Sequence, residues 1–270
     1  MKQNFLDQLD GGWGDVIADT YRESNAFKPP YKKSTYNDET YIELAERYDN
    51  NPELVENKEL YFENGLEYIP EYSFYNTNIT GDLIFPNSLK EIGMLAFAEC
   101  KNIKEISFPQ SLLNIGQFAF NQCIGLENLK LNNGLKNILF YAFAGCKNLK
   151  TIDFGTTLQT IAYSAFEKCG LEGNLVLPDS LIRMESKVFE NCKNLNGTLT
   201  LGKNLFEIRE YCFYGCNFTG ELYIPKSVEL IGKYAFSGCK FSTIYVNRMN
   251  ESNWDQDWNK GCDADIEYYF

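Results

Sequence analysis

Cysteine is the side chain with the greatest capacity for chemistry in this sequence, which has nine cysteines and no histidine. Seven of them recur once in every 23 or 24 residues: Cys100, Cys123, Cys146, Cys169, Cys192, Cys216 and Cys239. A zinc site needs two close cysteine pairs, but Cys212 and Cys216 form a single pair with no second one nearby. We predict no metal site and interpret the regular cysteines as small buried hydrophobic residues stacked in a column. Stacked strands lie ~4.8 Å apart, so spacing alone permits disulfides, whereas burial and a reducing compartment argue against them.

Carboxylates are the next candidates for chemistry. Four aspartates cluster near the C-terminus: Asp255, Asp257, Asp263 and Asp265. They lack the spacing, the glycine and the closing glutamate of a calcium-binding loop, so a solvated acidic segment is the favoured interpretation. The absence of histidine removes the commonest general base, and the sequence contains no phosphate-binding loop motif. We predict a non-enzymatic protein without a cofactor. A carboxylate-based hydrolase is an alternative that needs two carboxyl groups about 5–10 Å apart in a cleft.

The charge of the chain excludes two classes of partner. The formal net charge is −12 and the pI is about 4.6, which argues against direct binding of nucleic acid or of an anionic membrane. Residues 1–53 contain six basic and eleven acidic residues, and residues 240–270 contain three and six, so acidity is concentrated toward the ends. The ends therefore support an alternative function: an acidic inhibitor, of phage or other mobile-element origin, that occupies the basic channel of a nucleic-acid-binding enzyme.

The hydrophobicity pattern predicts a cytoplasmic protein. No apolar run approaches the roughly 20 residues that a membrane-spanning helix needs. The first 20 residues carry four aspartates and no apolar core, so they do not have the pattern of a secretory signal peptide.

A repeat of 23 residues organises most of the chain and positions the cysteines. Each unit carries an anchor phenylalanine at the same position, usually after an alanine: Phe74, Phe97, Phe120, Phe143, Phe166, Phe189, Phe213 and Phe236. A unit begins with a short strand such as residues 106–108, whose outer side chains point inward, and a proline often follows. Leucine and isoleucine then fill the core, and we predict a short helical turn that contains the alanine and the phenylalanine. Parallel strands, one per unit, are expected to stack into a continuous sheet.

Two flanking segments lie outside the repeat. Residues 1–53 show helical spacing of apolar residues, which predicts an N-terminal helical cap or, alternatively, an interaction arm that carries Trp13 and Tyr21. Residues 247–270 are rich in aromatic residues and are expected to form a C-terminal cap, because a bare last unit would expose core and an unpaired strand edge.

The repeat resembles the BspA-like leucine-rich repeat family, over about residues 54–246. That family shares the pattern Leu-x-x-Ile-x-x-x-Ala-Phe-x-x-Cys followed by Leu-x-x-Ile-x-x-Pro. The matching segments are Cys100–Pro109 (CKNIKEISFP) and Leu112–Cys123 (LLNIGQFAFNQC). The resemblance implies an α/β leucine-rich repeat solenoid of about eight units, used for protein binding and often found on cell surfaces.

A protein-binding surface is the functional site that we expect. Apolar and aromatic residues precede the alanine in neighbouring units: Met94, Phe118, Phe140, Tyr141 and Tyr163. Such a patch marks an interface if it is exposed. The alternative is that these side chains lean inward and cover the edge of the core. The outward strand positions form a second, mixed candidate face. The leading prediction is a protein-protein interaction scaffold with a protein partner, and Trp13 and Tyr21 are further candidates.

Overall fold

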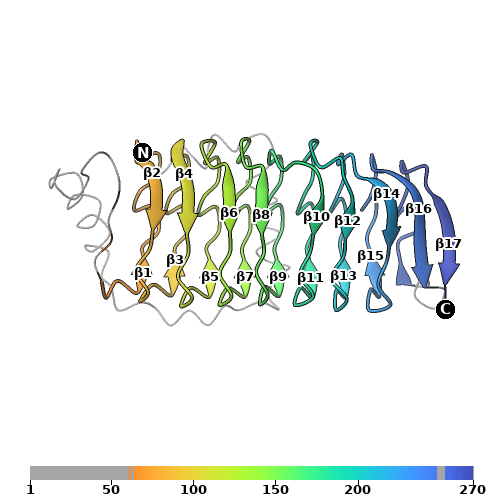
Figure 1. The fold of residues 1–270 in the computed structure, drawn as a ribbon, viewed down its shortest axis with the longest axis horizontal. Coiled ribbons are helices and arrows are strands. Elements are labelled where there is room, and N and C mark those ends of the chain that lie inside the picture. The colour runs from red at the N-terminus through yellow and green to blue at the C-terminus, as the bar shows by residue number, and fades with distance from the viewer. Residues whose placement is uncertain (1–59, 61, 63, 248–252, 270) are drawn as a thin grey trace. The chain divides into compact units, whose positions relative to one another are not determined.

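The computed structural model describes residues 60, 62, 64–247 and 253–269, which belong to one compact unit, Tyr41–Phe270. The predicted N-terminal helical cap, with Trp13 and Tyr21, lies outside the described residues. Two rows of short parallel strands run along the stack of repeats (Figure 1). Each full repeat contributes one strand to each row, rather than the single strand that the sequence predicted.

The first row is one continuous eight-stranded sheet. Its strands are two residues long: β1 (Tyr68–Ile69), β3 (Glu91–Ile92), β5 (Asn114–Ile115), β7 (Asn137–Ile138), β9 (Thr160–Ile161), β11 (Arg183–Met184), β13 (Glu207–Ile208) and β15 (Leu230–Ile231). Each strand pairs in register with the equivalent strand of the next repeat, as Ile92 does with Ile115. The second residue of every strand is buried, so this row carries the isoleucine column of the core.

The second row contains the strands that the sequence predicted, but it is not continuous. It forms sheets of four, two and three strands: β2 (Thr80–Ile84), β4 (Asn102–Ser107), β6 (Asn128–Lys130) and β8 (Thr151–Asp153); β10 (Leu175–Val176) and β12 (Leu199–Thr200); and β14 (Thr219–Tyr223), β16 (Lys240–Asn247) and β17 (Asp265–Tyr269). Gly81, Gly173 and Gly220 have positive φ within or before the first strand of each sheet. A glycine in this conformation favours a β-bulge, and the register shifts next to Gly81 in the β2–β4 pair and next to Gly220 in the β14–β16 pair.

The predicted helical turn is wrong, because no α-helix occurs in the described part of the chain. In the turn before Cys123, Phe118 N donates to Phe140 O of the next repeat at 2.8 Å, and Phe120 N donates to Ala142 O at 2.8 Å. Ala119 N, between them, donates to Gly116 O at 3.2 Å within the turn. Phe118 has a φ of 54°, a left-handed value that a right-handed helix cannot contain. Alternate amides therefore bond to the neighbouring repeat instead of continuing a helix.

The core consists of columns of identical side chains. The anchor phenylalanines stack almost parallel from one repeat to the next, with 5.2 Å between the ring centroids of Phe97 and Phe120 and 5.3 Å between those of Phe143 and Phe166. Such ring pairs contribute about 0.5–1.5 kcal/mol each beyond the burial of their area. Every anchor phenylalanine is at most 3% exposed. The predicted core positions of leucine and isoleucine after the strand, such as Leu112 and Ile115, are buried and thus confirmed.

The cysteine column is confirmed as buried, and its thiols are free. Each regular thiol donates a hydrogen bond to the carbonyl of the anchor phenylalanine in the preceding repeat. Cys123 Sγ lies 3.1 Å from Phe97 O, and Cys192 Sγ lies 3.1 Å from Phe166 O. The column thus combines small apolar volume with a donor that an alanine would lack.

The C-terminal aromatic residues close the last repeat. Trp258 packs edge-on against Phe236, with 5.9 Å between the ring centroids, and Trp254 packs against Trp258 at 5.2 Å. Strand β17 then pairs in parallel with β16. Residues 253–269 therefore extend the stack while the two tryptophans cover its core.

Candidate functional site

The left-handed position of each turn builds a ridge of side chains along the stack. It is occupied by Tyr72, Leu95, Phe118, Tyr141, Ser164, Lys187, Tyr211 and Tyr234, all with φ between 53° and 63°. A buried residue, which is alanine in five of the eight turns, and the anchor phenylalanine follow immediately, so these side chains lie over the edge of the core. We define the turn ridge as Phe118, Tyr141, Lys187, Tyr211 and Tyr234 from these positions together with Tyr163, which directly precedes Ser164, and all six are half-buried.

The aromatic part of the turn ridge is a continuous run of ring contacts. Phe118 and Tyr141 stack with 4.8 Å between centroids and an interplanar angle of 7°. Tyr141 then meets Tyr163 edge-on at 5.4 Å. The structure thus brings together three of the residues that the sequence singled out, and they both cover the core edge and remain partly exposed.

A lysine joins this run to a second aromatic pair. The Lys187 ammonium lies 5.8 Å from the ring centroids of both Tyr163 and Tyr211, within range of a cation–π interaction. Tyr211 in turn contacts Tyr234 at 5.4 Å. Lys233 and Lys260 lie 4.9 and 5.7 Å from the Tyr234 ring. The turn ridge therefore changes from aromatic to mixed aromatic and cationic along its length.

The other predicted interface residues lie apart from the run. Met94 and Phe140 are partly exposed, one residue before the left-handed position of their own turns. None of the ring contacts among the described residues involves Phe140, and Leu95, next to Met94, is only 3% exposed and points inward.

Two carboxylates in the turns, of the buried Glu167 and the half-buried Glu190, are paired with cations. Glu167 is 5% exposed and lies 2.5 Å from Lys168 Nζ, while Glu190 lies 3.6 Å from Lys187 Nζ. Burial raises the pKa of Glu190, and the negative charge of Glu167 adds to the effect. These ion pairs stabilise the turns. Among the described residues, no group of three or more cysteine, aspartate or glutamate side chains is arranged to hold a metal ion.

A buried glutamate between two arginines anchors the later repeats. Glu207 is 6% exposed, and its two oxygens lie 2.9 Å from Arg183 Nε and 2.6 Å from Arg209 Nε. Removal of either arginine would leave the buried Glu207 carboxylate poorly solvated. We therefore interpret this cluster as one that stabilises the fold.

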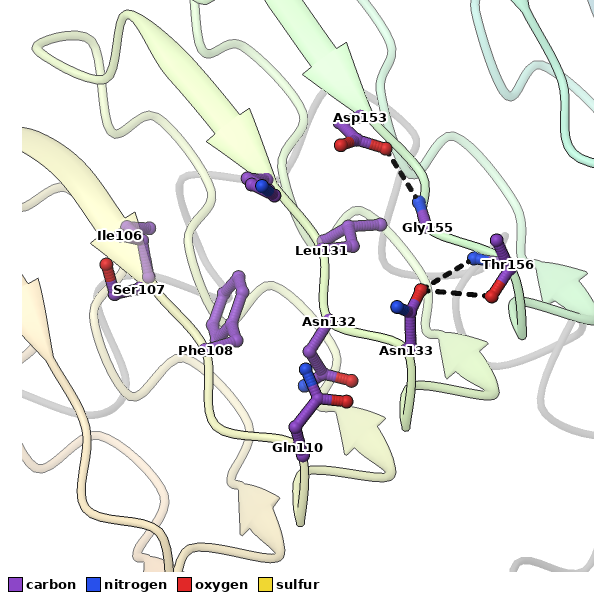
Figure 2. Close-up of a pocket in the computed structure, with 11 residues that line it drawn as sticks. Ile106, Ser107, Phe108, Gln110, Leu131, Asn132, Asn133, Asp153, Gly155 and Thr156 are labelled. Atoms are coloured by element: carbon purple, nitrogen blue, oxygen red, sulfur yellow. Dashed lines mark hydrogen bonds between the residues drawn. The ribbon is translucent and has the colours of Figure 1, made fainter.

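A polar hollow lies at the carboxyl ends of β4, β6 and β8, and the sequence analysis missed it. It has a volume of about 470 Å³ and is lined by Ile106, Ser107, Phe108, Gln110, Lys130, Leu131, Asn132, Asn133, Asp153, Gly155 and Thr156. Figure 2 shows that these residues come from three consecutive repeats. The sequence signal that could have found it lies directly after the strand, where two adjacent repeats have Asn132 and Gly155 in place of the proline of four other repeats.

The backbone around the hollow is fixed by side-chain hydrogen bonds. The Asn132 amide donates to Pro109 O, and its Oδ1 accepts from Gly134 N and Leu135 N, each at 2.6 Å. Asn133 Oδ1 accepts from both the backbone N and the hydroxyl of Thr156, at 3.0 and 3.1 Å (Figure 2). The hollow is therefore a preformed feature of the loops.

The profile of the BspA type leucine-rich repeat region matches residues 67–196 and 173–262, with six copies. The chain belongs to the BspA-type leucine-rich repeat family. The predicted resemblance is thus confirmed, and the parallel-strand solenoid is the fold that this family implies. A search of curated protein sequences finds no significant match. No segment of the described chain forms a helix long and apolar enough to cross a membrane.

Solved leucine-rich repeat structures resemble the chain. A leucine-rich repeat protein from Eubacterium ventriosum is 24% identical over 60% of this chain and 44% of that chain, with a TM-score of 0.50. The leucine-rich repeat protein TpLRR of T. pallidum is 25% identical over 64% of this chain and 70% of that chain, with a TM-score of 0.46. A third, from Bacteroides ovatus, is 18% identical over 78% and 77% of the two chains, with a TM-score of 0.45. At 24% identity, the similarity to the Eubacterium ventriosum protein shows a shared fold and carries no information about function.

Proposed function

We propose that this BspA-type repeat protein is a non-enzymatic protein-binding module and that the turn ridge is its contact surface. The observation that carries the proposal is the unbroken run of half-buried aromatic rings and one lysine across six turns. Tyrosine and phenylalanine are enriched at protein interfaces, because a large ring contributes contact area and loses little conformational entropy.

The scaffold beneath the turn ridge favours this use. Tyr141 N donates to Tyr163 O at 3.0 Å, and Tyr211 N donates to Lys233 O at 3.0 Å, so bonds between repeats fix the backbone of the ridge. Ring contacts between neighbours further restrict the side chains. A surface that is ordered before binding loses less entropy when a partner docks.

The test is capture of proteins from a lysate of the source cells on the immobilised intact chain. The ridge variant carries Phe118→Ser, Tyr141→Ser and Tyr163→Ser. The matched control carries Ile84→Ser, Val176→Ser and Tyr223→Ser, which replace three strand residues that are 63%, 64% and 58% exposed. Circular dichroism and thermal unfolding must show that both variants remain folded. Each retained protein is then purified and its binding measured directly by calorimetry.

We expect a protein that binds the intact chain and the control but binds the ridge variant at least about tenfold more weakly. A partner that the control loses and the ridge variant keeps would place the interface on the strand face instead. A nucleic-acid-binding enzyme that binds both variants and is released by high salt would favour the acidic inhibitor. The proposal fails if no purified protein binds the intact chain.

A further inference from the structure

We propose that the polar hollow binds a neutral saccharide. The site lies at the strand ends of three repeats and shares no residue with the turn ridge, so it does not depend on the protein-binding function. Its volume of about 470 Å³ falls within the range of small-molecule sites, which is roughly 300–1,000 Å³.

The hollow exists because two adjacent repeats depart from the common loop. Four repeats have proline, a variable residue and serine after the strand, whereas these two have Asn132-Asn133-Gly134 and Gly155-Thr156-Thr157. One further repeat, with Gly202-Lys203-Asn204, also departs from the common loop, but both of its neighbours have the proline. Gly155 has a φ of 63° and no side chain, and an added Cβ would lie 2.9 Å from Asn133 Oδ1. These two loops lack the proline ring, and amide and hydroxyl groups line the space instead (Figure 2).

Several polar groups that line the hollow have no partner among the residues that the structure describes. Lys130 and Asp153 face each other in register on β6 and β8 but form no ion pair with one another. One carboxylate oxygen of Asp153 accepts a hydrogen bond from Gly155 N at 3.0 Å, and the other oxygen is free. The hydroxyl of Ser107 and the amide of Gln110 also remain available on the walls of the hollow.

The charges and groups of the hollow fit a sugar better than an ion. One ammonium and one carboxylate cancel, so the site has no net attraction for an anion or a cation. Amides, a hydroxyl and a carboxylate together offer both donors and acceptors, which matches sugar hydroxyls that each donate and accept. The partly exposed ring of Phe108 adds an apolar wall for the C–H face of a sugar ring.

The loops are also ordered for binding. Asn132 holds three backbone groups of the loop, and Thr156 fixes the Asn133 side chain. Asn133 therefore keeps its amide nitrogen oriented while its oxygen is occupied. A ligand that enters does not have to order these groups, which raises the affinity that a few hydrogen bonds can provide.

The test is saturation-transfer NMR of the full chain with D-glucose, D-galactose, D-mannose and N-acetyl-D-glucosamine, each at millimolar concentration, and with glycine as a zwitterionic competitor. Ser107→Trp places a large side chain over the hollow from an exposed strand position. Ile84→Trp is its matched control, because Ile84 is the exposed register neighbour of Ser107 on β2. Gln110→Ala provides a second variant, with Asn87→Ala at the equivalent loop position of the preceding repeat.

We expect at least one saccharide to bind the intact chain and Ile84→Trp equally, and Ser107→Trp about tenfold more weakly or not at all. Gln110→Ala should weaken binding where Asn87→Ala does not. The proposal is overturned if none of the saccharides binds, if Ser107→Trp and Gln110→Ala both bind normally, or if glycine alone binds. None of these results bears on capture by the turn ridge, so the two proposals fail independently.

Discussion

Replacing Cys192 by alanine should reduce the loss of stability that this protein suffers in alkaline solution. The Cys192 side chain is fully buried, and its Sγ donates to Phe166 O at 3.1 Å. Burial raises the pKa of Cys192 from 9.0 to about 12, because a thiolate in the apolar core would lose its hydration.

The sign and size of the effect follow from proton linkage. Below pH 9 the thiol is protonated in both states and contributes no pH dependence. Between pH 9 and pH 12 it ionises in the unfolded chain but stays protonated in the folded one, so the unfolded state binds fewer protons and the free energy of unfolding falls as pH rises. Cys192 alone then accounts for a loss of about 1.4 kcal/mol at pH 10 and about 2.7 kcal/mol at pH 11.

Urea unfolding of the intact chain and of Cys192→Ala, followed by circular dichroism with a reductant present, measures this loss. At pH 8 the variant is less stable, because it lacks the sulfur contacts and the hydrogen bond to Phe166. At pH 10 the gap between the two chains should shrink by about 1.4 kcal/mol. Tyrosines and lysines titrate in both chains, so their effects cancel in the difference. A gap that stays constant from pH 8 to pH 10 would refute the reasoning and show that the folded thiol ionises normally.

Substitutions in the loops give three further predictions, all measurable by urea unfolding. Gly116→Ala should cost about 3 kcal/mol or more, because the new carbon would lie 2.5 Å from Ile92 O of the neighbouring repeat. Gly173→Ala should cost only about 1–2 kcal/mol, because no atom lies within 4 Å and only its φ of 70° opposes a side chain; equal costs at the two positions would contradict this contrast. Asn132→Asp should cost about 1–3 kcal/mol through loss of the donor to Pro109 O. Part of that cost should disappear as the pH falls and the new carboxyl gains a proton to donate, whereas a cost independent of pH would mean that this hydrogen bond contributes little.

The candidate sites were only partly predictable. The sequence placed Phe118, Tyr141 and Tyr163 on adjacent turns, because equal spacing brings equivalent positions side by side in a stack. It gave no information about whether the rings of Phe118 and Tyr141 touch one another, since that depends on the left-handed conformation of these two residues. The hollow went unnoticed because its residues come from three segments that lie 20 positions apart along the chain, and only the stacking of repeats joins these segments.

The sequence by itself determined the repeat, its period and the inward side chains. A period of 23 residues with fixed apolar positions can bury its phenylalanine and cysteine columns only by stacking, so register and core followed from spacing. Tertiary structure decided the backbone of the turn. A short segment with alanine and phenylalanine is compatible with a helix when considered alone. In the stack, the amides of Phe118 and Phe120 bond to carbonyls of the next repeat instead. The sequence of a single repeat does not reveal this hydrogen-bonding pattern, because the acceptor carbonyls belong to the neighbouring repeat.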